Sequence, residues 1–225
     1  MRRLIFVIAG CLFFLLNSAK GQVTKFEKYE IEAVGVSMSR VTIMGKEAIK
    51  VIKDATIRAV DEPTFIKLNA VDFSDGTIEV KVLSKLLKNA PETARGFIGL
   101  AFHINSDNTR FESIYIRPLN ARADDQVRRN HSIQYFAYPD FKFDRLRKEV
   151  PERYESYSDM QMNKWITLKI EVDGANARLF IDKNLQPSLV VNDLKLGAKS
   201  RGAIGLWVDI GTEGYFADLK IIPRK

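Results

Sequence analysis

The chain has 225 residues, of which 46% are hydrophobic, and a formal net charge of +7 at pH 7. Its lysines and arginines are interspersed with aspartates and glutamates, so the sequence contains no basic stripe of the kind that binds nucleic acid. The single cysteine, Cys11, excludes a disulfide framework within the chain.

Residues 1–21 have the features of a secretory signal peptide. Arg2 and Arg3 precede an apolar run from Leu4 to Leu16, and small and polar residues follow it. The run is shorter than the roughly 20 apolar residues that a membrane-spanning helix needs. We therefore expect cleavage after Ala19-Lys20-Gly21 and no transmembrane segment. The mature chain, residues 22–225, is expected in the periplasm or outside the cell.

Cys11 leaves an alternative open. Ile8-Ala9-Gly10-Cys11 is similar to a bacterial lipobox, in which case a lipid on Cys11 would anchor the protein. If Cys11 is instead removed with the signal peptide, the mature chain has no cysteine. Thiolate catalysis and cysteine-based metal sites are then excluded.

The first half of the mature sequence consists of short alternating or β-branched segments separated by turn residues, a pattern that predicts β-strands. The expected strands cover residues 29–33, 40–43, 48–52, 65–68 and 77–83. Met44-Gly45-Lys46 predicts a hairpin turn between the second and third of them, and Asp75-Gly76 predicts a turn before the fifth.

The second half shows the same pattern more clearly. The expected strands cover residues 96–104, 111–117, 132–138, 165–172, 177–182, 203–210 and 215–222. Residues 144–149 read as one short helix and residues 121–130 as a loop. The fold class predicted is therefore all-β: one domain at 22–225, an antiparallel two-sheet β-sandwich of jelly-roll type with one short helix.

Three pairs of segments resemble the concanavalin A-like lectin and glucanase sandwiches. They are Arg95–Phe102 with Arg110–Arg117, Trp165–Gly174 with Ala177–Ile181, and Gly202–Trp207 with Gly214–Ile221. They occur in the family's order across residues 75–222. The resemblance implies a concanavalin A-like jelly roll and a carbohydrate ligand. Within the superfamily the chain is most similar to exported bacterial proteins grouped with family 16-like glycoside hydrolases and 3-keto-disaccharide hydrolases.

The sequence departs from family 16 at the catalytic strand. Those glucanases carry Glu-x-Asp-x-Glu, or the same motif one residue longer, on a single strand, and no expected strand here has it. Whether the chain is an enzyme is therefore left open. The carboxylates considered for catalysis are Glu112 and Glu155. Because Glu112 shares a strand face with Ile114 and Ile116, we expect it to pair with an arginine or to have a raised pKa.

Half of the aromatic residues of the mature chain lie between Phe102 and Tyr157. The same stretch holds many arginines: Arg110, Arg117, Arg122, Arg128, Arg129, Arg145, Arg147 and Arg153. Aromatic rings stack on sugar faces, and planar polar groups bind hydroxyls and carboxylates. This composition favours a carbohydrate site, including one for an acidic glycan. It also fits aromatics that fill a core and arginines that coat a loop.

The alternation of side chains along each strand indicates which residues could form the carbohydrate site. It directs His103, Tyr115, Arg117, Trp207 and Asp209 outward, beside small residues that would leave a shallow groove. A loop that covers Trp207 is the alternative. Only one of Gln134 and Tyr135 can share that face. The full set of predicted ligand-binding residues is His103, Tyr115, Arg117, Asn120, Gln134, Tyr135, Arg145, Trp207 and Asp209.

The sequence contains no pattern that is typical of a metal-binding site. His103 and His131 do not have the spacing of zinc ligands, and we expect no metal site and no cofactor. Members of the superfamily often hold a structural Ca²⁺, and Asp72, Asp75 and Asp209 are the residues that could supply oxygen ligands to one here.

The expected function is that of an exported carbohydrate-binding or carbohydrate-processing sandwich. As a hydrolase it would cleave a glycosidic bond in an oligosaccharide or a modified sugar. The alternative is a non-catalytic envelope module that binds a protein partner, because outward arginines and aromatic residues serve protein interfaces equally well.

Overall fold

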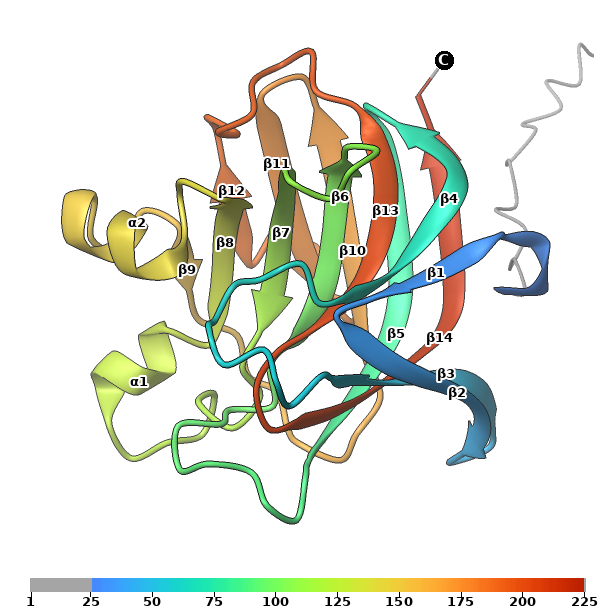
Figure 1. Cartoon of the computed structure of the whole chain (residues 1–225). Helices are drawn as coiled ribbons and strands as arrows, with labels where there is room; N and C mark the ends of the chain where they lie inside the picture. The colour runs from blue at the N-terminus through green and yellow to red at the C-terminus, as the bar shows by residue number, and fades with distance from the viewer. Residues whose placement is uncertain (1–25, 225) are drawn as a thin grey trace, which may run out of the picture.

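The computed structural model describes residues 26–224, which form two antiparallel β-sheets packed face to face (Figure 1). The expected signal peptide and the alternative anchor at Cys11 lie outside the described residues. The first sheet has the strand order β1 (Ile31–Val34), β4 (Phe65–Phe73), β13 (Gly202–Val208), β6 (Ile98–Ile104), β7 (Phe111–Ile116), β8 (Ile133–Tyr138) and β9 (Glu155–Ser156). The second has the order β12 (Leu189–Val191), β11 (Asn176–Ile181), β10 (Ile166–Asp173), β5 (Gly76–Leu86), β14 (Thr212–Pro223), β3 (Lys46–Lys53) and β2 (Val36–Ile43). The predicted antiparallel β-sandwich is confirmed.

The alternation in β10 shows why the sheets pack. Ile166, Leu168, Ile170 and Val172 are buried, whereas the residues between them are partly exposed. In the register with β5, Leu168 lies opposite Val80, so aliphatic side chains of adjacent strands form one face. Removing that face from water is the main favourable contribution to the packing of the two sheets.

Gly214 of β14 identifies which side chains of the first sheet face the second. A Cβ atom on Gly214 would lie 2.5 Å from Val208 Cγ1 and 3.1 Å from Ile98 Cδ1, so these two side chains point towards the second sheet. Their neighbours Trp207 and Gly99 therefore belong to the opposite, outer face. Every residue of β6 and β7 is nevertheless buried, so the outer face is covered as well.

The cover comes from residues 54–64, between β3 and β4, together with the start of α2 (Phe143–Glu149). In Figure 1 this connection crosses in front of the first sheet and approaches α2. Trp207 Nε1 donates a hydrogen bond to the carbonyl of Glu62 at 3.0 Å, and the amide of Phe143 donates to Asp61 Oδ2 at 2.8 Å. Lys142 also forms an ion pair with Glu62. These contacts attach the connection to both the sheet and the helix.

The remaining elements are short. α2 confirms the helix expected at 144–149, and a 3₁₀ turn spans Phe26–Lys28. The loop expected at 121–130 is partly wrong, because its last residues form α1 (Gln126–Asn130), capped by the side chain of Asp125. Within residues 26–224, no helix has the length and apolar character needed to cross a membrane.

Candidate functional site

Tyr115 and Trp207 meet on the outer face of the first sheet. Gly99 of β6 lies opposite Tyr115 in one neighbouring strand and opposite Trp207 in the other. Because Gly99 has no side chain, the two rings approach across it to a centroid distance of 4.7 Å. Both residues point outward as predicted, but Trp207 is fully buried beneath the 54–64 connection. An open groove with Trp207 in its floor is therefore wrong, and the loop-covered alternative is confirmed.

A cavity of about 420 Å³ opens beside these rings, at the edge of the sheet where β7 and β13 end and β6 begins. Four arginines line it, and we call it the arginine pocket. Its polar lining residues are Arg95, Arg117, Arg128, Arg147, Asp61, Asp209, Asn120, His131 and Thr93, and its apolar or aromatic ones are Val60, Phe97, Tyr115, Phe143 and Ile210. Tyr115, Arg117, Asn120 and Asp209 are the predicted binding residues that reach it.

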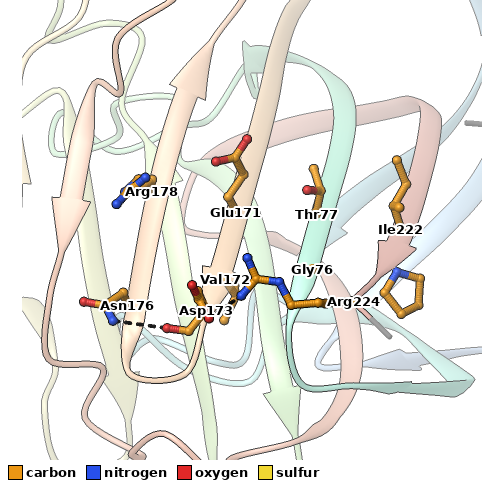
Figure 2. Close-up of a pocket in the computed structure, with 10 residues that line it drawn as sticks. Gly76, Thr77, Glu171, Val172, Asp173, Asn176, Arg178, Ile222 and Arg224 are labelled. Atoms are coloured by element: carbon orange, nitrogen blue, oxygen red, sulfur yellow. Dashed lines mark hydrogen bonds and ion pairs between the residues drawn. The ribbon is translucent and has the colours of Figure 1, made fainter. Parts of the chain in front are cut away.

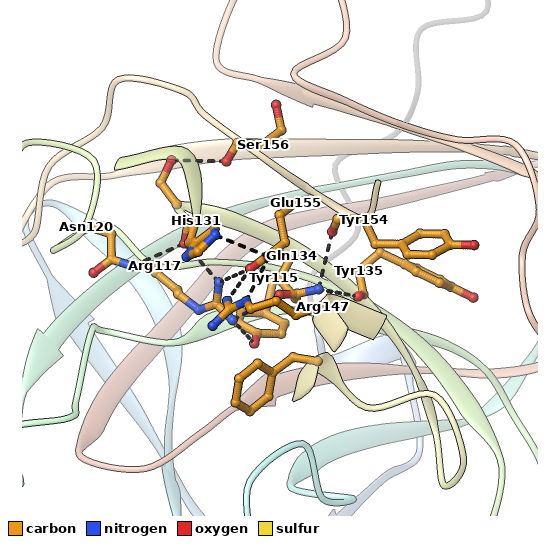
Figure 3. A network of polar contacts seen from close by, with 12 residues as sticks. Tyr115, Arg117, Asn120, His131, Gln134, Tyr135, Arg147, Tyr154, Glu155 and Ser156 are labelled. Carbon is orange, nitrogen blue, oxygen red and sulfur yellow. Dashed lines mark hydrogen bonds and ion pairs between the residues drawn. The ribbon is translucent and has the colours of Figure 1, made fainter. Parts of the chain in front are cut away.

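Arg117 is the centre of the polar network in Figure 3. Its Nη2 donates to Tyr115 Oη at 2.7 Å and to Gln134 Oε1 at 3.1 Å, and its Nη1 donates to the carbonyl of His131 at 2.9 Å. Gln134 lies opposite Tyr115 in the β7–β8 register, so Gln134 is the member of the Gln134–Tyr135 pair that faces outward. These contacts hold the Arg117 guanidinium in one orientation at the base of the pocket.

Glu155 lies behind the arginines and is nearly buried. It forms ion pairs with Arg147 and with Arg117 at 3.2 Å, and its Oε2 lies 3.4 Å from His131 Nε2. Burial opposes the ionisation of Glu155, but the hydrogen bond from Arg147 and the charge of Arg117 outweigh it and lower the pKa of the carboxyl group. An ionised Glu155 is suited to hold the two arginines in place, whereas a general acid needs a raised pKa.

The pKa of the Asp61 carboxyl group is shifted in the opposite direction to that of Glu155. Asp61 is 1% exposed, and burial, together with the charge of nearby Asp209, raises its pKa to about 7. Asp209 Oδ2 accepts a hydrogen bond from the Asp61 amide at 2.9 Å, and Asp209 also pairs with the buried Lys53. Asp61 therefore gains or loses a proton near neutral pH, whereas Asp209 already has a cationic partner.

Asn120 contributes an acceptor without a partner. Its Nδ2 donates to the carbonyl of His131 at 3.2 Å, but its buried Oδ1 has no hydrogen-bond partner among residues 26–224. Burial lowers the pKa of the neighbouring His131, against the pull of Glu155. An unsatisfied buried acceptor costs on the order of 1–3 kcal/mol, and rotation of the Asn120 side chain towards the pocket would let a ligand hydroxyl group satisfy it.

His103, Glu112 and Tyr135 form a separate network between the sheets. Glu112 is fully buried, its Oε2 lies 2.7 Å from His103 Nδ1, and its Oε1 accepts from Tyr135 Oη at 2.7 Å. The outward placement of His103 is wrong, because its backbone is left-handed (φ 55°) and interrupts the alternation of β6. The expected arginine partner of Glu112 is also wrong, since His103 occupies that position.

Other predicted residues lie outside the pocket. Arg145 is on the exposed side of α2, where it pairs with Glu149 at 2.8 Å and stacks on Phe141. Of the carboxylates considered for calcium, Asp72 pairs with Arg201 and Asp75 accepts from the Gly174 amide. Within the described residues, no cluster of three or more histidine, cysteine or acidic side chains could hold a metal ion.

A second cavity, of about 470 Å³, lies against the second sheet (Figure 2). Glu171, Arg178 and Thr77 line it, and Arg224 closes one side through an ion pair with Asp173. No aromatic ring is among its lining residues in the described part of the chain. The arginine pocket, which has aromatic walls as well as four arginines, is the stronger candidate for a ligand site.

Alternation along strands could not identify several residues of the arginine pocket. Asp61 and Arg95 lie in connections between strands, and Arg128 and Arg147 lie on short helices. The only sequence signal for them is the density of arginines between Phe102 and Tyr157, which includes Arg128 and Arg147 but not Asp61 or Arg95.

No protein-family model matches the sequence, and no curated protein is significantly similar to it. Among solved structures, the carbohydrate-binding module CBM66 from Bacillus subtilis is similar with a TM-score of 0.55, 17% identity and coverage of 84% of this chain and 92% of that one. A candidate glycosyl hydrolase from Parabacteroides distasonis is similar with a TM-score of 0.54, 9% identity and coverage of 95% and 99%. A Bacillus subtilis protein of unknown function with a galectin-like fold gives a TM-score of 0.51, 11% identity and coverage of 88% and 91%. At these identities the similarities establish the fold alone, a two-sheet β-sandwich.

Proposed function

We propose that this chain is an exported carbohydrate-binding sandwich that takes a saccharide into the arginine pocket. The observation that carries the proposal is the combination, in one cavity of about 420 Å³, of aromatic walls and guanidinium donors, with the unpaired Oδ1 of Asn120 buried in its wall. Concave sites with a few well-placed polar groups are typical of small-ligand binding. Export is supported by the signal-like sequence at residues 1–21.

Each part of the pocket has a role in this binding mode. Phe97 and Phe143 offer partly exposed rings against which the C–H face of a sugar can pack. The guanidinium groups donate to ring and hydroxyl oxygens, and Asn120 Oδ1 accepts from a hydroxyl group. The similarity in fold to a carbohydrate-binding module supports the same assignment. A protein partner would be expected on a flat patch, whereas this site is a cavity.

A second candidate function is carbohydrate processing, with Asp61 as the general acid. Its pKa of about 7 is near the operating range of such a group, and it lines the pocket. The sequence resemblance to family 16-like and 3-keto-disaccharide hydrolases supports this candidate. Glycoside hydrolysis normally uses two carboxyl groups, however, and the second one here, Asp209, is paired with Lys53. We therefore favour binding without hydrolysis.

The test is a glycan-array screen of the full mature chain, combined with an assay for sugar release from each bound glycan. Asn120→Ala is expected to weaken binding at least tenfold, because the variant removes the unpaired acceptor. Arg145→Ala, on the exposed side of α2, is the matched control and should bind normally. Sugar release that is lost in Asp61→Asn would move the assignment to processing. A folded chain that binds and cleaves no glycan would contradict both candidates.

A further inference from the structure

The four arginines of the pocket are not equally compensated. Arg117 and Arg147 share the carboxylate of Glu155. Neither Arg95 nor Arg128 forms an ion pair with any carboxylate in residues 26–224. Arg95 Nη1 instead donates to backbone carbonyls, including that of Ala94 at 2.7 Å. Two of the guanidinium groups that line the pocket therefore lack an acidic partner.

The carboxyl groups of the pocket do not supply the missing charge. Asp209 is paired with Lys53, and Asp61 is protonated in part at neutral pH because burial raises its pKa to about 7. Burial, and then the positive charges of Arg128 and Arg117, lower the pKa of Arg95. These three guanidinium groups line one cavity and repel one another as like charges. The pocket consequently has an excess of positive charge.

We infer that the arginine pocket selects a saccharide with a negatively charged group, a carboxylate or a sulfate ester, which Arg95 and Arg128 bind. The inference rests on the proposed function and adds the chemical class of the ligand. Guanidinium groups bind planar and tetrahedral oxyanions through parallel hydrogen bonds. Asn120 lines the same cavity, and rotation of its side chain presents the unpaired Oδ1 to a hydroxyl group of the same sugar.

Arginines that only coat a solvated surface would not line a cavity together with aromatic rings, and none of them would be partly buried there. Arg95 is only partly exposed, and the unpaired Asn120 Oδ1 is buried in the same cavity. Arginines without an acidic partner also occur elsewhere in residues 26–224, for example Arg40, Arg58 and Arg110, which are exposed and line neither cavity. Arg95 and Arg128 differ from these because both line one cavity together with aromatic rings.

The inference is tested by calorimetric titration of the full mature chain with three sets of tetrasaccharides. The first set contains galacturonate, glucuronate, mannuronate and guluronate tetramers. The second contains the same sugars with the carboxyl groups reduced to alcohols, and the third contains sulfated neutral tetramers. At least one charged tetramer is expected to bind tenfold or more tightly than its uncharged counterpart. This preference should decline as salt is added, because exposed charges are screened.

Arg128→Gln and Arg95→Gln remove a charge but retain hydrogen-bond donors. Each is expected to lower the affinity for the charged tetramer about tenfold and to leave the affinity for the uncharged one unchanged. Arg128 is exposed, so Arg128→Gln should fold normally. Arg145→Gln is the control that removes the same charge outside the pocket.

The outcomes separate the inference from the proposed function. Binding of sulfated but not carboxylated tetramers would support the inference and identify the anion as sulfate. Equal binding of charged and uncharged tetramers, or unchanged binding by Arg128→Gln, would overturn the inference while the proposed function stands. A chain that binds no saccharide in these sets or on the array would overturn both.

Discussion

The backbone amide of Asp61 donates a hydrogen bond to Asp209 Oδ2 at 2.9 Å. This bond joins the connection that covers the first sheet to the segment that follows β13. The Asp61 carboxyl group in turn accepts from the Phe143 amide at the start of α2. Three segments that are distant in sequence therefore meet at Asp61, and its ionisation affects both the stability of the fold and the charge of the arginine pocket.

Stability is expected to depend on the protonation of Asp61. Its pKa is raised from 3.8 to about 7, so the folded chain holds the proton more tightly than the unfolded chain does. The contribution of Asp61 to the free energy of unfolding is therefore greatest below about pH 4, and it falls as the pH rises from about 4 to 7. Above that range it no longer changes with pH. The slope should approach about 1.4 kcal/mol per pH unit. Urea unfolding of the chain and of Asp61→Asn across this range measures it.

The Asp61→Asn variant should lack this part of the slope, because an amide does not titrate. Asp124→Asn, a substitution of an exposed carboxylate in the loop before α1, is the control and should leave the slope unchanged. Parallel pH profiles for the wild-type chain and Asp61→Asn would show that Asp61 is not responsible.

Binding of a charged saccharide should depend on the same group. Below about pH 7 Asp61 becomes neutral and the pocket gains positive charge, so an anionic ligand should bind more tightly at pH 6 than at pH 8. Calorimetry at both values measures the difference. The difference should disappear in Asp61→Asn, and tighter binding at pH 8 than at pH 6 would be incompatible with the charge balance described for the pocket.

Glu155→Gln is expected to destabilise the fold. The substitution leaves the guanidinium groups of Arg117 and Arg147 without their shared counterion, and removing one member of a buried ion pair costs roughly 3 kcal/mol. The pKa of Glu155 is lowered, so its stabilisation is present above the unfolded pKa near 4.3 and is lost as pH falls through the folded value. Urea unfolding should show a large difference from wild type at pH 7 and a smaller one at pH 3. A difference that grows in acid would contradict this role.

Gly99→Ala should disturb the contact between Tyr115 and Trp207. A Cβ atom on Gly99 would lie 2.3 Å from the carbonyl oxygen of Ile114 and 2.5 Å from Tyr115 Cα, and these backbone atoms cannot rotate away. We expect a loss of about 1–3 kcal/mol in the free energy of unfolding. The aromatic circular-dichroism signal should also weaken as the rings separate. Unchanged stability and an unchanged spectrum would show that the rings do not require a glycine between them.

Local patterns predicted most of the fold. The alternation of Trp165–Val172 gave the buried face of β10 correctly. Met44 and Gly45 form the turn between β2 and β3 as expected, and Asp75 lies between β4 and β5, whose first residue is Gly76. Strand pairing also resolves the choice that the sequence left open between Gln134 and Tyr135, because β7 and β8 keep a regular register. These features depend on residues that are close in sequence or on a fixed period of two.

The site was harder to predict because it depends on long-range contacts and irregular backbone. The left-handed residue His103 interrupts the period of two, so alternation assigned its side chain to the wrong face. Trp207 is covered by Glu62, which lies 145 positions earlier in the chain. Asp61 and Arg95 belong to connections in which no periodic pattern indicates where a side chain points.

The most direct test of the binding site is an NMR titration of the isotopically labelled mature chain with the saccharide that binds it most tightly. The proposal predicts that the largest amide shifts cluster at Asp61, Asn120, His131 and Arg128, around the arginine pocket. Shifts confined to Thr77, Glu171 and Arg178, at the second cavity, would contradict it and place the ligand on the other sheet.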